Sequence, residues 1–142
     1  MAFETLHEET AGALAKDPFL AERKVEILLE DKGDVTAAIK SAIARMGICA
    51  IVAMPGAKAQ SENARAVTAM AEITVQVLEN PLMNRQRANA CSAGSAARRI
   101  AAALNLLRFP GGETLVFTEI TSGALDKDTL VFSVYFKALT TL

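Results

Sequence analysis

The chain has 142 residues, of which 51% are hydrophobic and 22% charged, and its formal net charge is −1. This composition is typical of a globular domain with one core and excludes disorder throughout the chain. No apolar run approaches the roughly 20 residues of a membrane-spanning helix, and the acidic start Met1–Glu4 is unlike a signal peptide. We therefore expect a cytoplasmic protein with a single domain over 1–142, comprising an N-terminal helical extension (1–24) and a core (25–139).

Residues that carry catalytic or metal chemistry are few. Cys49 lies in an apolar run and Cys91 at a predicted helix start, so we expect two free thiols, buried or half-buried, without metal-ligand spacing. The single histidine, His7, is expected on a surface helix, and any zinc site or activated nucleophile would have to use it. We therefore predict no enzyme, no metal site and no cofactor.

Charge is distributed unevenly along the chain. Residues 1–34 carry nine acids and four bases, residues 35–112 three acids and nine bases, and residues 113–142 four acids and two bases. The three segments have net charges of −5, +6 and −2. Such asymmetry bears on association partners rather than on the fold. Two interpretations stay open: surfaces that meet charged partners, or chance scatter over solvated faces.

The first third of the chain predicts a helix, a strand and a second helix. Residues 3–16 can form a short helix with few apolar anchors, packed outside the domain or on a neighbouring subunit. Residues 25–30 predict a short strand. Apolar residues at helical spacing predict an amphipathic helix over 34–46, begun by Asp34 and ended by Gly47.

The middle of the chain predicts two strands and a long loop. The continuous apolar run 48–54 is typical of a strand covered on both faces. Residues 55–66 are small and polar and show neither the helical nor the strand period of hydrophobicity. They predict a long loop of the kind that is often functional or mobile. In 71–79 apolar and polar residues alternate, so we expect a half-buried central strand that ends before Pro81.

The remaining residues predict a helix and a hairpin. Residues 80–112 contain five arginines and no acid, and within them Ser92 begins an alanine-rich helix over 92–107. Residues 115–121 and 129–137 then alternate as the two strands of a hairpin. The residues expected to contact a partner come from the long loop and the arginine-rich segment: Lys58, Asn63, Arg85, Arg87, Arg98 and Arg99.

These elements predict an α+β fold. We expect a mainly antiparallel sheet with the helices 34–46 and 92–107 packed on one face. The core order β-α-β-β-α-β is that of a split βαβ fold, with a strand added at its C-terminal end and a helix before its start. Such a fold hosts many unrelated functions, so it does not decide the function.

The order and spacing of these elements carry a family resemblance over 25–139: the helix ended by Gly47, the apolar strand, the long loop, the stretch Glu79-Asn80-Pro81, the alanine-rich helix and the closing hairpin. In this the chain resembles the tail-terminator and tail-completion proteins of tailed bacteriophages and prophages. The resemblance implies a non-enzymatic structural protein that forms a homo-oligomeric ring, caps the tail tube and contacts head-connector proteins. It also implies assembly in the cytoplasm and a final place in the virion tail.

An alternative stays open at this point. A split βαβ fold also suits a regulatory module that binds a small metabolite at a subunit interface. No aromatic residue interleaves with the arginines of 80–108, which removes the usual stacking platform for single-stranded nucleic acid. We therefore expect no sequence-specific nucleic-acid binding, and the lack of a long apolar run predicts no membrane partner.

Overall fold

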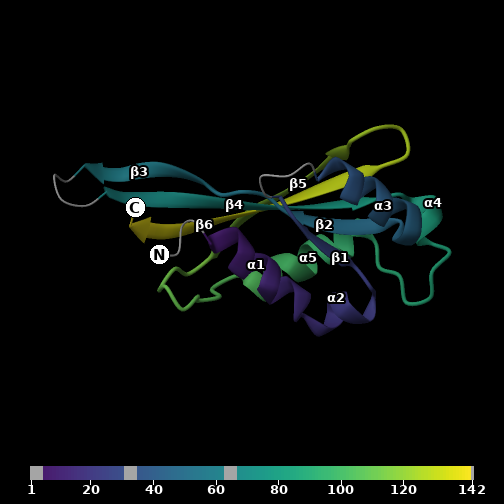
Figure 1. Ribbon diagram of the computed structural model, residues 1–142, viewed down its shortest axis with the longest axis horizontal. Helices are drawn as coiled ribbons and strands as arrows, with labels where there is room; N and C mark the ends of the chain where they lie inside the picture. Colours follow the sequence, from purple (N-terminus) through teal and green to yellow (C-terminus); the bar gives the residue numbers. More distant parts are fainter. Residues whose placement is uncertain (1–4, 31–34, 63–66, 142) are drawn as a thin grey trace.

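The computed structural model describes residues 5–30, 35–62 and 67–141, except for the side chains of 58–62, 67–68 and 141. Over these residues the chain has the predicted α+β character (Figure 1). The elements, in chain order, are α1 (Leu6–Ala15), α2 (Pro18–Glu22), β1 (Glu26–Leu29), α3 (Thr36–Met46), β2 (Ile48–Val52), β3 (Gly56–Glu62), β4 (Val67–Glu79), α4 (Pro81–Asn84), α5 (Ala93–Leu104), β5 (Val116–Ala124) and β6 (Leu130–Thr141).

The strands form one six-stranded sheet in the order β1-β2-β4-β6-β5, with β3 also paired to β4. Only β1 and β2 are parallel, and the other pairs are antiparallel, which confirms the prediction of a mainly antiparallel sheet. However, β1 and β2 are direct neighbours. The prediction of a split βαβ core is therefore wrong in this detail, because no strand lies between the two strands that α3 connects.

The predicted loop over 55–66 is largely a strand. Both β2 and β3 pair with the central strand β4, β2 with its last residues and β3 with its first ones, and Ala53 N–H donates to Thr74 O (2.9 Å) between them. Residues 48–62 and 67–79 therefore form one long ribbon (Figure 1). The strand was missed because β3 has no β-branched or aromatic residue: small Ala57, Ala59 and Ser61 alternate with the longer polar residues Lys58, Gln60 and Glu62.

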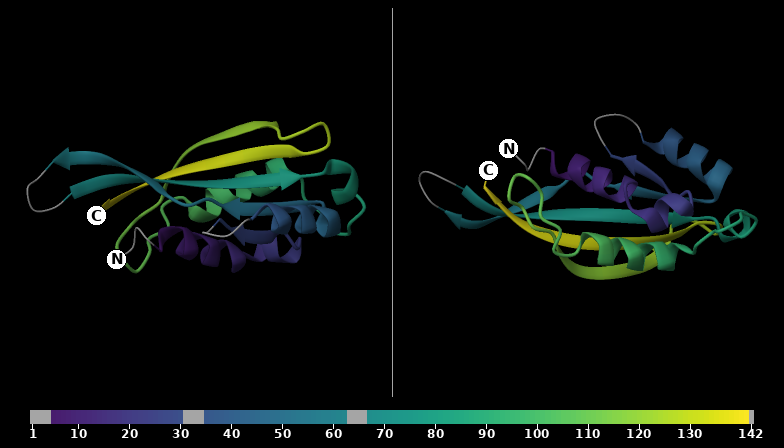
Figure 2. Two further views of the ribbon diagram at one scale, coloured as in Figure 1. Left: turned by 45° about the horizontal axis from the view of Figure 1, so that its top comes forward. Right: turned by 90° about the horizontal axis from the view of Figure 1, so that it is seen from below.

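The two predicted helices lie on opposite faces of the sheet, which corrects the expectation that they share one face. The main core lies between one face and the helices α1 and α5, which pack side by side (Figure 2). A smaller cluster of Ala42, Cys49, Ile51 and Leu78 joins α3 to the other face. The strand β2 is buried along its whole length, as predicted, and each of its faces needs a different helix to cover it.

The N-terminal helix belongs to the main core. Leu6 and Leu14 of α1 are fully buried there, and Thr10 between them donates its hydroxyl to Leu6 O (2.7 Å). The spacing of four residues places all three on one stripe of the helix. His7 is only 6% exposed. The expectations that this helix packs outside the domain and that His7 lies on its surface are therefore wrong.

The predicted helix boundaries are mostly confirmed. Gly47 ends α3 in a left-handed conformation (φ 74°), and Ser92 begins α5, because its Oγ accepts from Ser95 N–H (3.1 Å). The helix α5 ends at Leu104 and not at residue 107. The predicted cap Asp34 lies outside the described residues.

Candidate functional site

A tight corner forms where the central strand β4 ends. Asn80 accepts a hydrogen bond from Met83 N–H (3.3 Å) and thereby begins the short helix α4, with Pro81 in its first position. Asn80 N–H in turn donates to Gly47 O (2.7 Å) at the end of α3. A Cβ on Gly47 would lie 2.5 Å from the backbone nitrogen of Asn84, so only glycine allows this approach.

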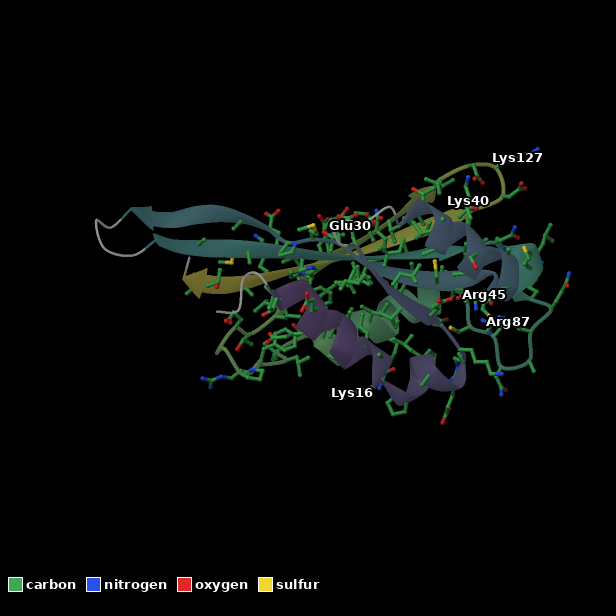
Figure 3. All side chains as sticks on the ribbon, viewed as in Figure 1. Lys16, Glu30, Lys40, Arg45, Arg87 and Lys127 are labelled. Carbon is green, nitrogen blue, oxygen red and sulfur yellow. The ribbon has the colours of Figure 1, made fainter. Side chains whose placement is uncertain are left out.

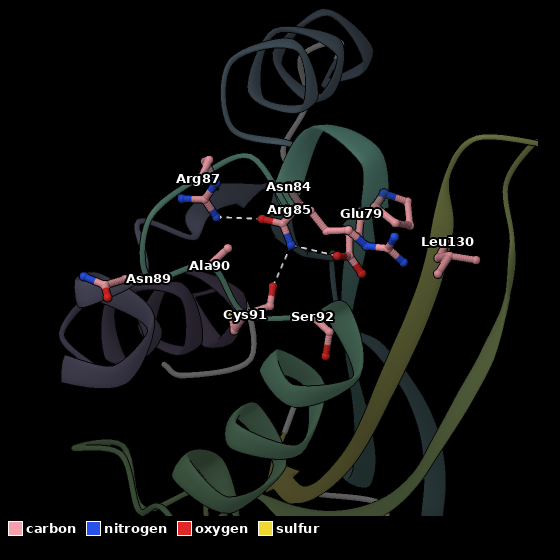
Figure 4. Close-up of a pocket in the computed structure, with 10 residues that line it drawn as sticks. Glu79, Asn84, Arg85, Arg87, Asn89, Ala90, Cys91, Ser92 and Leu130 are labelled. Carbon is pink, nitrogen blue, oxygen red and sulfur yellow. Dashed lines mark hydrogen bonds between the residues drawn. The ribbon is translucent and has the colours of Figure 1, made fainter.

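A buried polar network holds this corner to α5 (Figure 4). The carboxylate of Glu79 accepts from Asn84 Nδ2 (2.7 Å) and from the backbone N–H of Ala93 (2.9 Å). Asn84 Nδ2 also donates to Cys91 O (2.7 Å). Glu79 thus places its own negative charge at the N-terminus of α5, where the helix dipole favours an anion.

The guanidinium of Arg87 extends the network to the N-terminal part of the chain. It donates to Asn84 Oδ1 and to the backbone oxygen of Arg23, each at 2.9 Å. Arg87 was predicted to contact a partner; in the structure both of its terminal guanidinium nitrogens donate within the subunit, while its buried Nε has no hydrogen-bond partner. Arg85, the other residue of this corner that was predicted to contact a partner, is exposed.

A cleft of about 560 Å³ opens beside the network and is lined by ten residues, including Arg85, Asn89, Ser92 and Leu130 (Figure 4). Its deepest polar groups, Glu79 and Asn84, already hydrogen-bond to each other and to the backbone. Among the described residues no group of His, Cys, Asp and Glu could hold a metal ion. The groups that remain available in the cleft are the exposed side chains of Arg85 and Asn89 and the buried Nε of Arg87.

Both cysteines are free and buried, as predicted. Burial, together with the nearby charge of Glu26, raises the pKa of Cys49 to about 11. Burial also raises the pKa of Cys91, against the opposing effect of Arg23 and Arg87. Neither thiol is ionised at neutral pH, so neither is activated as a nucleophile.

Arg99, a second predicted partner residue, is paired within the subunit. Its guanidinium donates to both carboxylate oxygens of Asp17, with a shortest distance of 2.7 Å. Asp17 also accepts from Leu20 N–H (3.1 Å) and so begins α2. Burial acts to raise the pKa of Asp17, but the hydrogen bonds from Arg99 and Leu20 outweigh it, and the net shift is downward.

The charge separation along the sequence is therefore partly balanced inside one subunit. The acidic N-terminal segment meets the basic middle segment at the Asp17–Arg99 pair and again where Arg45 contacts Glu26 (2.8 Å). The other predicted partner residues are placed as follows. Arg98 is exposed on α5, Lys58 lies in β3 with its side chain outside the description, and Asn63 lies outside the described residues.

Charged side chains of both signs lie at one end of the molecule, where Asp126 and Asp128 flank Lys127 and Arg45 pairs with Glu26. Figure 3 shows Lys40, Arg45, Arg87 and Lys127 at the end that carries α3, α4 and the β5–β6 turn. The corner helix α4 adds two exposed apolar side chains there, Leu82 and Met83, which are separated from Arg85 by the buried Asn84. This helix has only four residues, which are too few to show a helical period in the sequence.

A second apolar surface lies on the open part of the sheet face that α3 only partly covers. Met70, Val116 and Leu139 line a hollow of about 480 Å³ there. A neighbouring hollow, which shares Lys137 with the first, is lined by Glu72 and Glu119. Sequence reasoning missed this surface, although alternation in the closing hairpin places Val116 and Leu139 on the face opposite Phe136.

No protein-family model matches the chain, and no curated protein does. Within the described residues, no helix is long and apolar enough to cross a membrane. Among solved structures, the chain is similar to a chain of "Virion of native gene transfer agent (GTA) particle", with a TM-score of 0.69 and 14% sequence identity. The match covers 96% of this chain and 95% of that chain. At this identity the likeness establishes a shared fold over nearly the whole length of both chains.

Proposed function

We propose that this protein is a structural component of a phage-like particle, and specifically a tail-terminator or tail-completion protein. Copies of the chain would form a ring that caps the tail tube and offers a surface to head-connector proteins. The observation that carries the proposal is the fold shared with a virion chain over 96% of this chain and 95% of that one. The family resemblance in the order and spacing of the elements supports the same role.

The chemistry of the β4–α4 corner supports a structural role over an enzymatic one. Glu79 and Asn84, the polar groups deepest in the cleft, are used to hold β4, α4 and α5 together. The thiol of Cys91 beside them is protonated at neutral pH, because burial raises its pKa. A corner built in this way fixes the shape of a subunit, as an assembly of identical subunits requires.

The exposed side chains suggest which surfaces meet partners. Arg85 and Arg98 are exposed, whereas Arg87 and Arg99 are engaged within the subunit. Exposed ion pairs each contribute at most about 1 kcal/mol, so apolar contacts must supply most of the affinity between subunits, and the charges mainly set register and rate. Assembly would take place in the cytoplasm, and the ring would remain in the tail of the particle.

The mass of the protein in solution tests this proposal. We expect sedimentation of the purified chain, alone and with purified tail-tube protein, to reveal a closed oligomer whose fraction rises with protein concentration. The variant Arg98→Glu should alter the salt dependence of assembly, while Lys127→Glu in the β5–β6 turn serves as a charge-matched control. A chain that stays monomeric in every mixture contradicts the ring and favours the metabolite-binding alternative.

A further inference from the structure

Two exposed apolar surfaces lie at different places on the molecule. The first, the sheet groove, consists of Met70, Val116 and Leu139, and Val116 and Leu139 are 46% and 57% exposed. The second, the α4 corner, consists of Leu82, Met83 and Arg85, and Leu82 is 70% exposed. Large apolar side chains gathered in one exposed place mark interaction sites more often than scattered ones do.

The sheet groove cannot receive the α4 corner of its own chain. Met70 and Glu79 lie near opposite ends of the same strand, β4, and α4 begins directly after that strand. Nine residues of strand span roughly 30 Å at about 3.3 Å per residue. Because β4 is paired with a neighbouring strand on each side, it cannot fold back to close this distance. Whatever covers the groove comes from another molecule.

The two surfaces complement each other in polarity and in charge. An apolar hollow of about 480 Å³ has room for more than one aliphatic side chain, and the α4 corner presents Leu82 and Met83 together. Carboxylates of Glu72 and Glu119 flank the groove, with Lys137 between the two hollows. The α4 corner belongs to the segment 80–112, which has five arginines and no acid.

We propose that the sheet groove of one copy receives the α4 corner of a second copy of this chain, with Leu82 as the apolar anchor and Arg85 facing Glu119. The contact joins two different surfaces, so it is heterologous and repeats from copy to copy, closing into a ring if the rotation allows. This contact depends on the ring proposed above, and these residues would form the interface between neighbouring subunits of that ring.

Two variants, each with one introduced cysteine, test the contact directly by crosslinking. Leu82→Cys and Leu139→Cys are made in separate chains that differ by a mass tag, and a short bis-maleimide is added to each alone and to their mixture. Cys49 and Cys91 are buried and serve as the background in the unsubstituted protein. We expect crosslinked dimers that contain one copy of each variant, with none from either variant alone, because a heterologous contact never brings two identical positions together.

Truncation of the anchor measures its importance. Leu82→Ala should raise the protein concentration at half-assembly by at least about tenfold, as removal of a central apolar anchor does. The matched control is Leu106→Ala, since Leu106 is 68% exposed and lies in neither surface. For the Leu106→Ala control, the protein concentration at half-assembly should stay within about twofold of the wild-type value.

Charge reversal tests the register of the contact. Arg85→Glu and Glu119→Arg should each weaken assembly by about fivefold, the magnitude of an exposed ion pair. A chain with both substitutions should recover assembly, because each copy contributes both surfaces and the pair is restored with opposite signs. Loss in the double variant equal to the product of the single losses would show that the two residues do not meet.

The outcomes separate this contact from the ring itself. A wild-type ring without mixed crosslinks, or one that tolerates Leu82→Ala as well as Leu106→Ala, overturns the contact and leaves the ring standing. A wild-type chain that is monomeric in every mixture contradicts both. Crosslinked dimers of Leu82→Cys alone would indicate a two-fold symmetric contact and would likewise overturn the proposal.

Discussion

The two faces of the sheet differ in how they are covered. On one face, α1 and α5 bury a continuous core that includes Ile73, Val77 and Phe136. On the other face, α3 covers only the end near β1 and β2, and the open part carries the groove of Val116 and Leu139. Residues that alternate along one strand therefore differ in environment: one set is buried in the core that stabilises the subunit, and the other includes the exposed side chains of the groove.

A pair of substitutions in β6 should separate the two faces most strongly. Phe136 is almost fully buried against α5, and Phe136→Ala should lower the free energy of unfolding by about 3–5 kcal/mol through lost burial and the cavity that remains. Leu139 lies on the same strand but faces the open side. Leu139→Ala should change the free energy of unfolding by less than about 1 kcal/mol. Chemical denaturation measures both. Similar losses at the two positions would remove the distinction between the faces.

Substitution of Gly47, at the close contact between α3 and α4, should have the next largest effect on the stability of the protein. Gly47→Ala places a side chain in a left-handed conformation, which costs about 1–2 kcal/mol, and the steric conflict with the backbone of Asn84 adds to this. Gly12→Ala, inside α1 with open space around it, should instead stabilise the protein by about 1 kcal/mol. Thermal melts compare the two variants. A neutral Gly47→Ala would mean that α3 and α4 are not locked together.

The Asp17–Arg99 pair on the helical side should give a smaller, pH-dependent effect. Asp17→Ala removes the cap of α2 and should cost about 0.5–2 kcal/mol at neutral pH. The folded-state pKa of Asp17 lies below its ordinary value of 3.8, so its contribution is present above the unfolded pKa. It is lost as the pH falls through the folded pKa.

Unfolding by urea between pH 2 and 7 checks this dependence. In Asp17→Asn, the free energy of unfolding should fall less steeply toward acid pH than in the wild type. Arg99→Ala should do the same, because it removes the largest of the effects that lower this pKa. Parallel curves for the wild type and Asp17→Asn would show that the ion pair does not influence the folded state.

The smallest expected effect is on the reactivity of a thiol beneath α3. Cys49 is fully buried by α3 and its pKa is about 11, so iodoacetamide at pH 8 should label it only when the chain opens. The labelling rate in the native state should therefore lie far below that in urea. Rapid native labelling at Cys49 would mean that α3 does not stay on this face, and the two faces would then differ even more.

Local patterns predict most of the elements, and their failures have physical causes. Gly47 and Ser92 are correct helix limits because capping depends on a few adjacent residues. The side on which each helix packs could not be predicted, because β2 is apolar on both faces and suits either arrangement. The strand β3 was missed because its residues are small or polar and none is β-branched or aromatic, as strand residues usually are.

The candidate sites were harder to predict than the fold. Arg85 was identified from the arginine-rich segment, but the partners of Arg87 and Arg99 come from residues far away in the sequence. Glu79 stood out only as part of the stretch Glu79-Asn80-Pro81, and its role was not predictable because it depends on meeting Asn84 and the first turn of α5 in space. Spacing along a chain cannot reveal hydrogen bonds that only tertiary contacts create.

The pairing of β6 with the central strand β4 affects how the chain folds. The hairpin of β2, β3 and β4 is local in sequence, but β4 then pairs along nearly its whole length with β6, which is separated from it by α4, α5 and β5. Ladders between distant segments slow folding because a long loop must close before the pairing stabilises it. During synthesis, the edge of β4 stays unpaired until the residues after 130 leave the ribosome. A nascent chain halted before that point would expose this edge, which is the form most prone to aggregate.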